Sequence, residues 1–110
     1  MIAIIDYDAG NLRSVEKALL SLGETPVITR DRKTILKADK VILPGVGSFG
    51  DAMGKLKQYD LVDVICETVD QGTPFLGICL GLQLLFAGSE ESHGAAGLGI
   101  LPGKILKIPE

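Results

Sequence analysis

The stretch Phe75-Leu-Gly-Ile-Cys-Leu-Gly-Leu-Gln-Leu-Leu-Phe86 decides how this sequence folds. It begins as an apolar run typical of a buried strand and continues with apolar residues at helical spacing, with no polar loop between. Cys79 stands at the junction, with Gly77 two residues before it and Gly81 two residues after it. This Gly-x-Cys-x-Gly pattern is typical of a nucleophile elbow, a sharp strand-to-helix turn that projects a reactive side chain above a sheet.

The two glycines and the helix start together predict a reactive cysteine. Strand and helix come so close in such a turn that a Cβ atom at Gly77 or Gly81 is expected to clash. Cys79 would lie at a helix N-terminus, where the dipole and the backbone amides favour the thiolate. The amide of Leu80 would point to where an oxyanion forms during acyl transfer. The alternative is a buried structural cysteine, which is how we interpret Cys66, on the apolar side of a predicted helix.

Apolar runs rich in Ile, Val and Leu recur along the chain and are typical of strands buried on both faces. These runs are Ile2–Ile5, Pro26–Thr29, Val41–Leu43 and Phe75–Ile78. Helices are expected over residues 11–23, 33–38, 50–59 and 61–70. The alternation predicts an α/β fold, a parallel sheet with right-handed crossovers and helices on both faces. A further strand is expected at Lys104–Ile108 with no helix after it, so residues 1–110 are interpreted as the N-terminal part of one larger, incomplete domain.

The segment after the third predicted strand is the second candidate for function. The strands ending at Leu43 and Ile78 are consecutive, so we expect them to be neighbours, with the amides of Val46 and Gly47 facing the cysteine as oxyanion donors. The same segment, Gly45-x-Gly-x-x-Gly50, satisfies the dinucleotide fingerprint, and a nucleotide-binding module is the alternative. That fingerprint normally opens the first βαβ unit, with an acid ending the next strand, and neither condition holds here.

Composition and charge exclude several classes of function. The 110 residues are 46% hydrophobic and 23% charged, as in an ordinary globular domain, and the net charge of −3 gives no reason for a nucleic-acid partner. We interpret the basic group around Arg30, Arg32 and Lys33 as a solvated helix face. Two unpaired cysteines and one histidine predict neither a metal site nor a disulfide, and no cofactor is expected. The sequence has no secretion signal, and Pro74–Gly88 is too short to span a membrane, so a cytoplasmic location is expected.

With these segments in view, the chain resembles the class I (triad-type) glutamine amidotransferases, and among them the glutaminase subunits of imidazole glycerol phosphate synthases. The opening Ile4-Ile-Asp-Tyr-Asp-Ala-Gly-Asn-Leu12 is similar to the family's start, with Asp8 in place of the usual glycine. Leu43-Pro-Gly-Val-Gly47 resembles the oxyanion strand, and Gly77–Phe86 resembles the nucleophile segment. The resemblance implies a flavodoxin-like class I glutamine amidotransferase fold, truncated here.

The resemblance also implies a reaction. Glutamine would be hydrolysed to glutamate and ammonia through a thioester on Cys79, with Leu80 and either Val46 or Gly47 holding the oxyanion. Gln83 and Glu91 match positions that contact the substrate glutamine in the family.

Ammonia would then pass to a cyclase subunit with a (β/α)8 barrel, in a heterodimer of histidine biosynthesis. The loop that ends at Asn11 would face that partner.

The base that this chemistry needs is not among the residues that resemble the family's motifs. The family's histidine and its orienting glutamate are far downstream, and we interpret His93 as a loop histidine rather than a replacement. We therefore expect the chain alone to be inactive, and to self-associate through an exposed edge or face of its sheet. An elbow-cysteine hydrolase or redox-protective protein of the same fold is the remaining alternative, and Pro44-Gly-Val-Gly47 argues against it.

Overall fold

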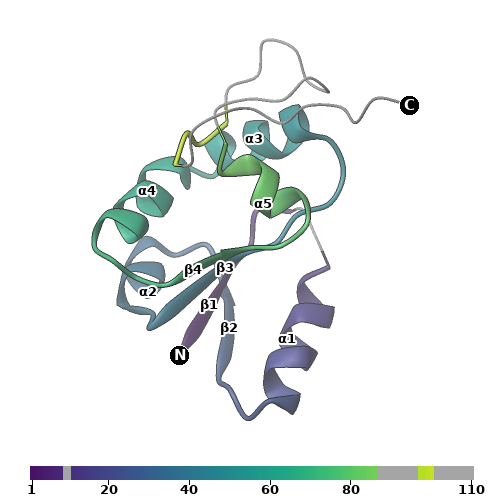
Figure 1. Cartoon of the computed structure of the whole chain (residues 1–110), viewed down its shortest axis with the longest axis vertical. Helices are drawn as coiled ribbons and strands as arrows, with labels where there is room; N and C mark the ends of the chain where they lie inside the picture. Colours follow the sequence, from purple (N-terminus) through teal and green to yellow (C-terminus); the bar gives the residue numbers. More distant parts are fainter. Residues whose placement is uncertain (9–10, 87–96, 101–110) are drawn as a thin grey trace.

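The sheet is parallel throughout, as the sequence predicts (Figure 1). In the computed structural model, which describes residues 1–8, 11–86 and 97–100, four strands are paired in the order β2-β1-β3-β4. The strands are β1 (Ile2–Ile5), β2 (Pro26–Thr29), β3 (Lys40–Leu43) and β4 (Phe75–Gly77). This order is that of a flavodoxin-like sheet, so the expected fold class is confirmed.

Helices connect the strands where the apolar periodicity places them. They are α1 (Leu12–Ser21), α2 (Arg32–Lys37), α3 (Phe49–Gln58), α4 (Val62–Asp70) and α5 (Leu80–Leu84). Asn11 caps α1 as expected, since its side-chain oxygen accepts from the Ser14 amide at 3.3 Å. Gly23 follows α1 with a φ of +80°, the conformation that favours glycine after a helix. The strand expected at Lys104–Ile108 lies outside the described residues.

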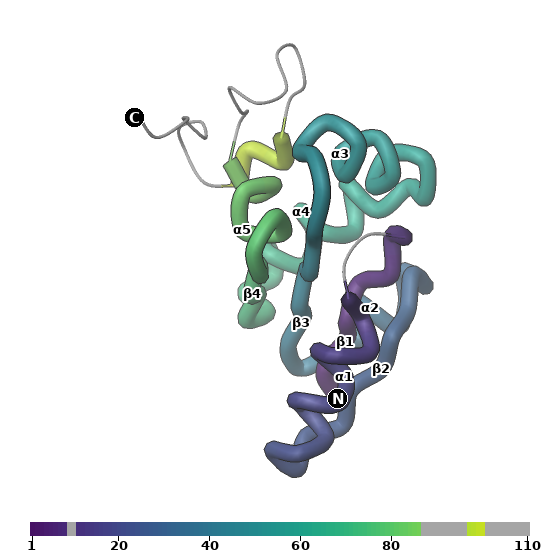
Figure 2. Tube along the Cα trace, turned by 90° about the vertical axis from the view of Figure 1, so that its right-hand side faces the viewer, coloured from purple at the N-terminus to yellow at the C-terminus, as the bar shows by residue number. Residues whose placement is uncertain are grey.

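The core lies on one face of the sheet, beneath α2, α3, α4 and α5. The inward-pointing strand residues include Ala3, Ile5, Val41 and Leu43, all at most 1% exposed. The helices contribute buried residues to the same cluster, namely Ile35, Phe49, Ala52, Met53, Leu56, Val64, Ile65, Leu80 and Leu84. Helix α1 lies against the other face, where its Leu19 lines a pocket with Ile2 and Ile42, and Figure 2 shows it in front of β1 and β2. Helices therefore lie on both faces of the sheet, as predicted, with four described helices over the core and α1 over the other face.

The α1 side keeps apolar surface in contact with solvent. No residue of α1 is buried, although the structure describes the whole helix. Leu22 is 74% exposed after α1, and Leu76 is 55% exposed on β4 at the edge of the described sheet. In the described part of the chain, no helix has both the length and the apolar composition to cross a membrane.

Candidate active site

The turn at Cys79 has the geometry of an elbow. Cys79 caps α5 with a φ of 53° and a ψ of −121°, an unusual backbone conformation for a side chain with a Cβ atom, and its side chain is exposed. Holding a non-glycine residue there costs about 1–3 kcal/mol, which the surrounding packing must supply. The Ile78 amide donates to the Leu43 carbonyl at 3.0 Å, so β3 fixes the chain up to the residue before the cysteine.

The flanking glycines are required by space, as predicted. A Cβ atom at Gly77 would lie 2.7 Å from the Cα atom of Leu82, in the helix that follows the turn. A Cβ atom at Gly81 would lie only 1.9 Å from the Leu43 carbonyl oxygen. The first contact is the strand-to-helix clash that the sequence predicts. The second is against the neighbouring strand β3, which the sequence pattern alone does not reveal.

The predicted pairing of the third and fourth strands brings the Gly45 segment onto the elbow. Leu43 lies opposite Gly77 in the sheet, and the Leu80 amide donates to the Gly45 carbonyl at 3.2 Å. The amide expected to hold an oxyanion therefore has an internal partner in this structure. Because the peptide is planar and trans, the Val46 N–H points away from Leu80 while the Gly45 carbonyl points toward it.

Gly45 itself is enclosed by protein. A Cβ atom there would lie 2.6 Å from the Tyr7 hydroxyl oxygen and 2.8 Å from the Gly81 nitrogen. Gly47, by contrast, has a φ of +95°, and a Cβ atom there would meet no heavy atom of the described residues within 4 Å. The first glycine thus allows two segments of the chain to pack together. It does not leave room for a pyrophosphate, and the nucleotide-binding alternative is not favoured.

Gln83, one turn into α5, carries an unusual side-chain atom. Its Oε1 is buried and lacks a hydrogen-bond partner among the described residues. A buried amide oxygen without a partner costs about 1–3 kcal/mol, so such atoms point to a group that completes the site. Glu91, the other predicted substrate contact, and His93 lie outside the described residues.

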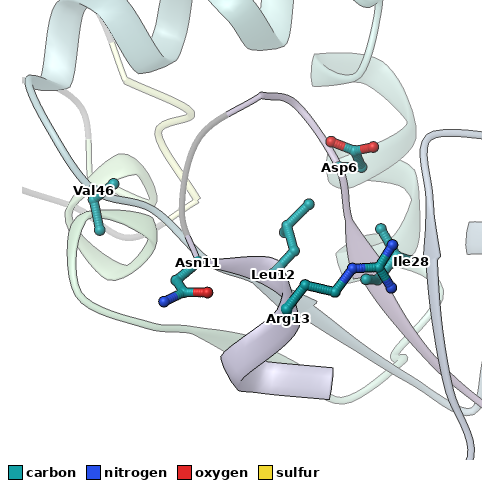
Figure 3. Close-up of a pocket in the computed structure, with 6 residues that line it drawn as sticks. All are labelled: Asp6, Asn11, Leu12, Arg13, Ile28 and Val46. Carbon is teal, nitrogen blue, oxygen red and sulfur yellow. The ribbon is translucent and has the colours of Figure 1, made fainter. Parts of the chain in front are cut away.

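Asn11 and Val46 line the same pocket, of about 480 Å³, at the carboxyl edge of the sheet (Figure 3). Its other walls are Asp6, Leu12, Arg13 and Ile28. The start of α1 and the loop after β3 come from distant parts of the sequence. The pocket therefore joins the residue expected to face a partner to a residue expected to serve the oxyanion.

A charged cluster beside this pocket was not predicted from the sequence. Arg30 lies 3.2 Å from a carboxylate oxygen of Asp6 and 3.2 Å from one of Asp8, and its guanidinium carbon lies 3.9 Å from the centroid of the Tyr59 ring. The Tyr59 hydroxyl donates to Asp8, and this bond, followed by Arg30, lowers the pKa of the Asp8 carboxyl. Arg30 follows β2 and precedes α2, so assigning it to a solvated helix face was wrong.

Tyr7, between the two acids, was also missed. Its side chain is fully buried and its hydroxyl donates to the Pro44 carbonyl at 2.5 Å. Burial raises the pKa of this hydroxyl well above its ordinary value, so it remains a donor. A tyrosine at the end of an apolar strand was the available signal, but its partner is 37 residues away in sequence.

Cys66 lies on α4 and differs from the prediction in its degree of burial. It is partly buried rather than a core residue. Partial burial raises the pKa of its thiol, and Asp70 and Asp63 on the same helix raise it further. These three causes all disfavour the thiolate, which fits a structural cysteine.

Comparison with known proteins relates nearly all of the chain to one family. The family described as glutamine amidotransferase class-I matches residues 3–104. The imidazole glycerol phosphate synthase subunit HisH of Bacillus cereus is 57% identical over 108 residues, which make up 98% of this chain and 52% of that protein. The same subunit from Moorella thermoacetica is 56% identical over 108 residues, 98% of this chain and 51% of that protein. The chain thus spans about half the length of the curated relatives it matches.

Solved structures support the fold. A crystal structure of a glutamine amidotransferase aligns with a TM-score of 0.76 at 22% identity, covering 92% of this chain and 53% of that one. A putative peptidase E from Listeria monocytogenes aligns with a TM-score of 0.73 at 15% identity, covering 91% of this chain and 62% of that one. At these identities the likeness concerns the arrangement of the elements and not their chemistry.

Proposed function

The chain belongs to the class-I glutamine amidotransferase family, and we propose that it is the N-terminal part of the glutaminase subunit of an imidazole glycerol phosphate synthase. The observation that carries the proposal is the Cys79 elbow, together with relatives of that description that are 56–57% identical. On this proposal, residues 1–110 belong to one domain that is incomplete at its C-terminus. The two free thiols accord with a reducing cytoplasm, which we keep as part of the proposal.

The proposed chemistry begins at the exposed thiol. The Cys79 thiolate attacks the side-chain amide carbon of glutamine, forming a C–S bond and placing negative charge on the amide oxygen. The C–N bond then breaks, and the leaving nitrogen takes a proton from a general acid and departs as ammonia. The same group, now a base, takes a proton from the water that hydrolyses the thioester to glutamate, and the Cys79 sulfur is released. The base is assigned to a histidine outside this chain, so we propose that the chain alone is inactive.

The oxyanion site is proposed to form by a local rearrangement. Leu80 is one proposed donor, and its amide is engaged by the Gly45 carbonyl. Turning the single peptide unit between Gly45 and Val46 would release the Leu80 amide and point the Val46 N–H toward the elbow. Gly47, which follows with a φ of +95°, gives the loop the backbone freedom for such a turn and is the alternative donor.

Substrate and partner contacts follow from the same geometry. We assign Gln83 to the substrate because its buried Oε1 lacks a described partner, and glutamine carries amide and ammonium donors. Glu91 is assigned to the substrate on resemblance alone. Asn11 is assigned to the surface that meets a (β/α)8-barrel cyclase, which takes up the ammonia in a heterodimer. Its position in one pocket with Val46 supports a link between partner contact and the oxyanion loop.

A chimera tests the function. This chain would replace the matched half of the Bacillus cereus HisH, and glutamate release from glutamine would be measured with the cyclase subunit present. We expect release that disappears in Cys79→Ala and persists in the matched control Cys66→Ala. A folded chimera that releases no glutamate would contradict the proposal. Release by the isolated chain that depends on Cys79 would contradict only its predicted inactivity.

Self-association of the isolated chain remains a prediction. The apolar side chains that α1 and the sheet leave exposed, including Leu20, Leu22 and Leu76, are the surface expected to associate. The sedimentation coefficient should therefore rise with protein concentration. A monomer at all concentrations would contradict the prediction that this surface associates.

A further inference from the structure

A buried hydroxyl connects the first strand to the segment that engages the elbow. The Tyr7 side chain has no exposed surface, and its hydroxyl donates to the Pro44 carbonyl at 2.5 Å. Pro44 immediately precedes Gly45, whose carbonyl accepts from the Leu80 amide. One hydroxyl thus fixes the peptide unit that directly precedes the one facing the elbow.

The packing around Gly45 makes this contact specific to tyrosine. The hydroxyl oxygen of Tyr7 lies 2.6 Å from where a Gly45 Cβ atom would be, so it fills the space that the glycine leaves. Pro44 contributes no N–H and is buried beside the tyrosine, so the hydroxyl supplies the donor for a buried acceptor. Phenylalanine would supply the ring and leave that carbonyl without its donor.

Tyr7 is itself held from outside. Arg30 pairs with Asp6 and Asp8, the residues on either side of it, and Tyr59 at the end of α3 donates to Asp8. The main chain on both sides of Tyr7 is therefore anchored to β2 and α3. Movement of Pro44 would have to break the hydroxyl contact, because the tyrosine is not free to follow.

We propose that Tyr7 is a positioning residue, whose hydroxyl holds the turn after β3 so that the Gly45 carbonyl stays on the Leu80 amide. The inference rests on the proposed function, in which that amide is a donor to the oxyanion. Tyr7 acts through the Pro44 carbonyl and not by contact with the substrate. The Tyr7 hydroxyl thereby determines how readily the Gly45–Val46 peptide unit turns and releases the Leu80 amide.

Amide hydrogen exchange of the 110-residue chain tests the proposal directly. In Tyr7→Phe, the Leu80 amide should exchange about fivefold faster, the effect of losing one hydrogen bond that supports its acceptor. The Ile78 amide, which donates to Leu43 one step earlier along the same two segments, is the internal reference and should be unchanged. Equal acceleration at both amides, or none at Leu80, would overturn the proposal. Tyr59→Phe, which removes the other tyrosine hydroxyl, is the matched control and should accelerate Leu80 exchange less than Tyr7→Phe does, because Arg30 still pairs with Asp6 and Asp8 and the Tyr7 hydroxyl still holds Pro44.

A second probe covers the case in which Tyr7→Phe does not fold. The chain has two tyrosines, so biosynthetic 3-fluorotyrosine in the Tyr59→Phe background labels Tyr7 alone. The fluorinated ring keeps the hydroxyl and makes it a stronger donor, so Leu80 exchange should slow while Ile78 exchange stays constant. No slowing at Leu80, with a fluorine resonance that shows one folded environment, would count against the proposal.

Two alkylating reagents separate this inference from the proposed function. A chloroketone analogue of glutamine passes through a tetrahedral adduct at its ketone before the thiol sulfur displaces chloride, whereas iodoacetamide reacts by direct displacement of iodide. In Tyr7→Phe, the chloroketone rate at Cys79 should rise at least about twofold relative to the iodoacetamide rate, because the Leu80 amide is released. A Leu80 exchange effect with no chloroketone preference in any variant would support the hold by Tyr7 and contradict the glutaminase proposal. A chloroketone preference that is equal with tyrosine and phenylalanine at position 7, with Leu80 exchange unchanged, would support the glutaminase proposal and contradict the hold by Tyr7.

Discussion

The two cysteines lie in regions that use the same residue type in opposite ways. Cys66 sits within α4, partly buried, with a thiol pKa raised by burial and by Asp70 and Asp63. Cys79 sits at a turn, exposed, at a backbone φ of 53° and at the start of α5. Regular helix geometry surrounds the first cysteine, whereas close packing of β3, β4 and α5 maintains the second. The difference teaches that the packing around the cysteine, rather than the cysteine itself, marks a candidate nucleophile.

Filling the tightest contact at the elbow should have the largest effect. Gly81→Ala puts a Cβ atom 1.9 Å from the Leu43 carbonyl oxygen, a backbone atom that cannot move alone. We expect the free energy of unfolding to fall by more than about 3 kcal/mol, measured by urea denaturation. Cys79 would then lose its exposed, fixed position together with the fold.

Gly54→Ala is the matched control in α3, where no described heavy atom lies within 4 Å of the added carbon. It should raise the free energy of unfolding by about 1 kcal/mol, as for an alanine in an open helix interior. A loss at Gly54 equal to that at Gly81 would show that the elbow packing has no special importance.

The reactivity of the two thiols gives the next largest contrast. With iodoacetamide at pH 8, Cys79 should be alkylated on the order of tenfold faster than Cys66, because it is exposed at a helix start while the Cys66 thiolate is disfavoured. Mass spectrometry of Cys66→Ser and Cys79→Ser assigns each rate to one sulfur. Faster modification of Cys66 would mean that the elbow does not activate its thiol.

Much of the fold could be predicted because apolar patterns are local. The strand Ile2–Ile5 was predicted with its observed bounds, and the elbow glycines were predicted to be required by space. The pairing of β3 with β4 was predicted from their adjacency in the chain, whereas the position of β1 between β2 and β3 does not follow from adjacency and was implied by the family resemblance. Glycine patterns at this site carried information because only a missing Cβ atom permits such close approach.

The rest depended on partners distant in sequence. The Tyr7 contact with Pro44 spans 37 residues, and the Arg30 pair with Asp8 spans 22. Charges near one another in sequence led to the wrong assignment of Arg30, since a charge pattern does not show which partners the fold brings together. The engagement of the Leu80 amide by Gly45 is likewise a matter of peptide orientation, which residue identity does not encode.

Replacing each cysteine by glycine should change stability in opposite directions. Cys79→Gly removes a Cβ atom at positive φ, and we expect the free energy of unfolding to rise by about 1 kcal/mol. Cys66→Gly, the counterpart within α4, should lower it by about 1 kcal/mol, because glycine is the poorer helix former and the packing of a partly buried side chain is lost. Urea titration measures both, and the same sign at both positions would contradict the view that Cys79 is held in a strained conformation.

The smallest expected effect concerns the charges around Cys66. Asp70 raises the pKa of the Cys66 thiol after partial burial does, so Asp70→Asn should lower that pKa and increase the thiolate population below it. Alkylation of Cys66 at pH 8 should then be faster by about twofold or less, since the pair is near the surface and screened by salt. The two proteins should react equally well above the Cys66 pKa, where both thiols are ionised. Asp63→Asn should have a smaller effect, and neither change should alter Cys79. An equal acceleration of both cysteines would mean that Asp70 acts through helix stability and not through its charge.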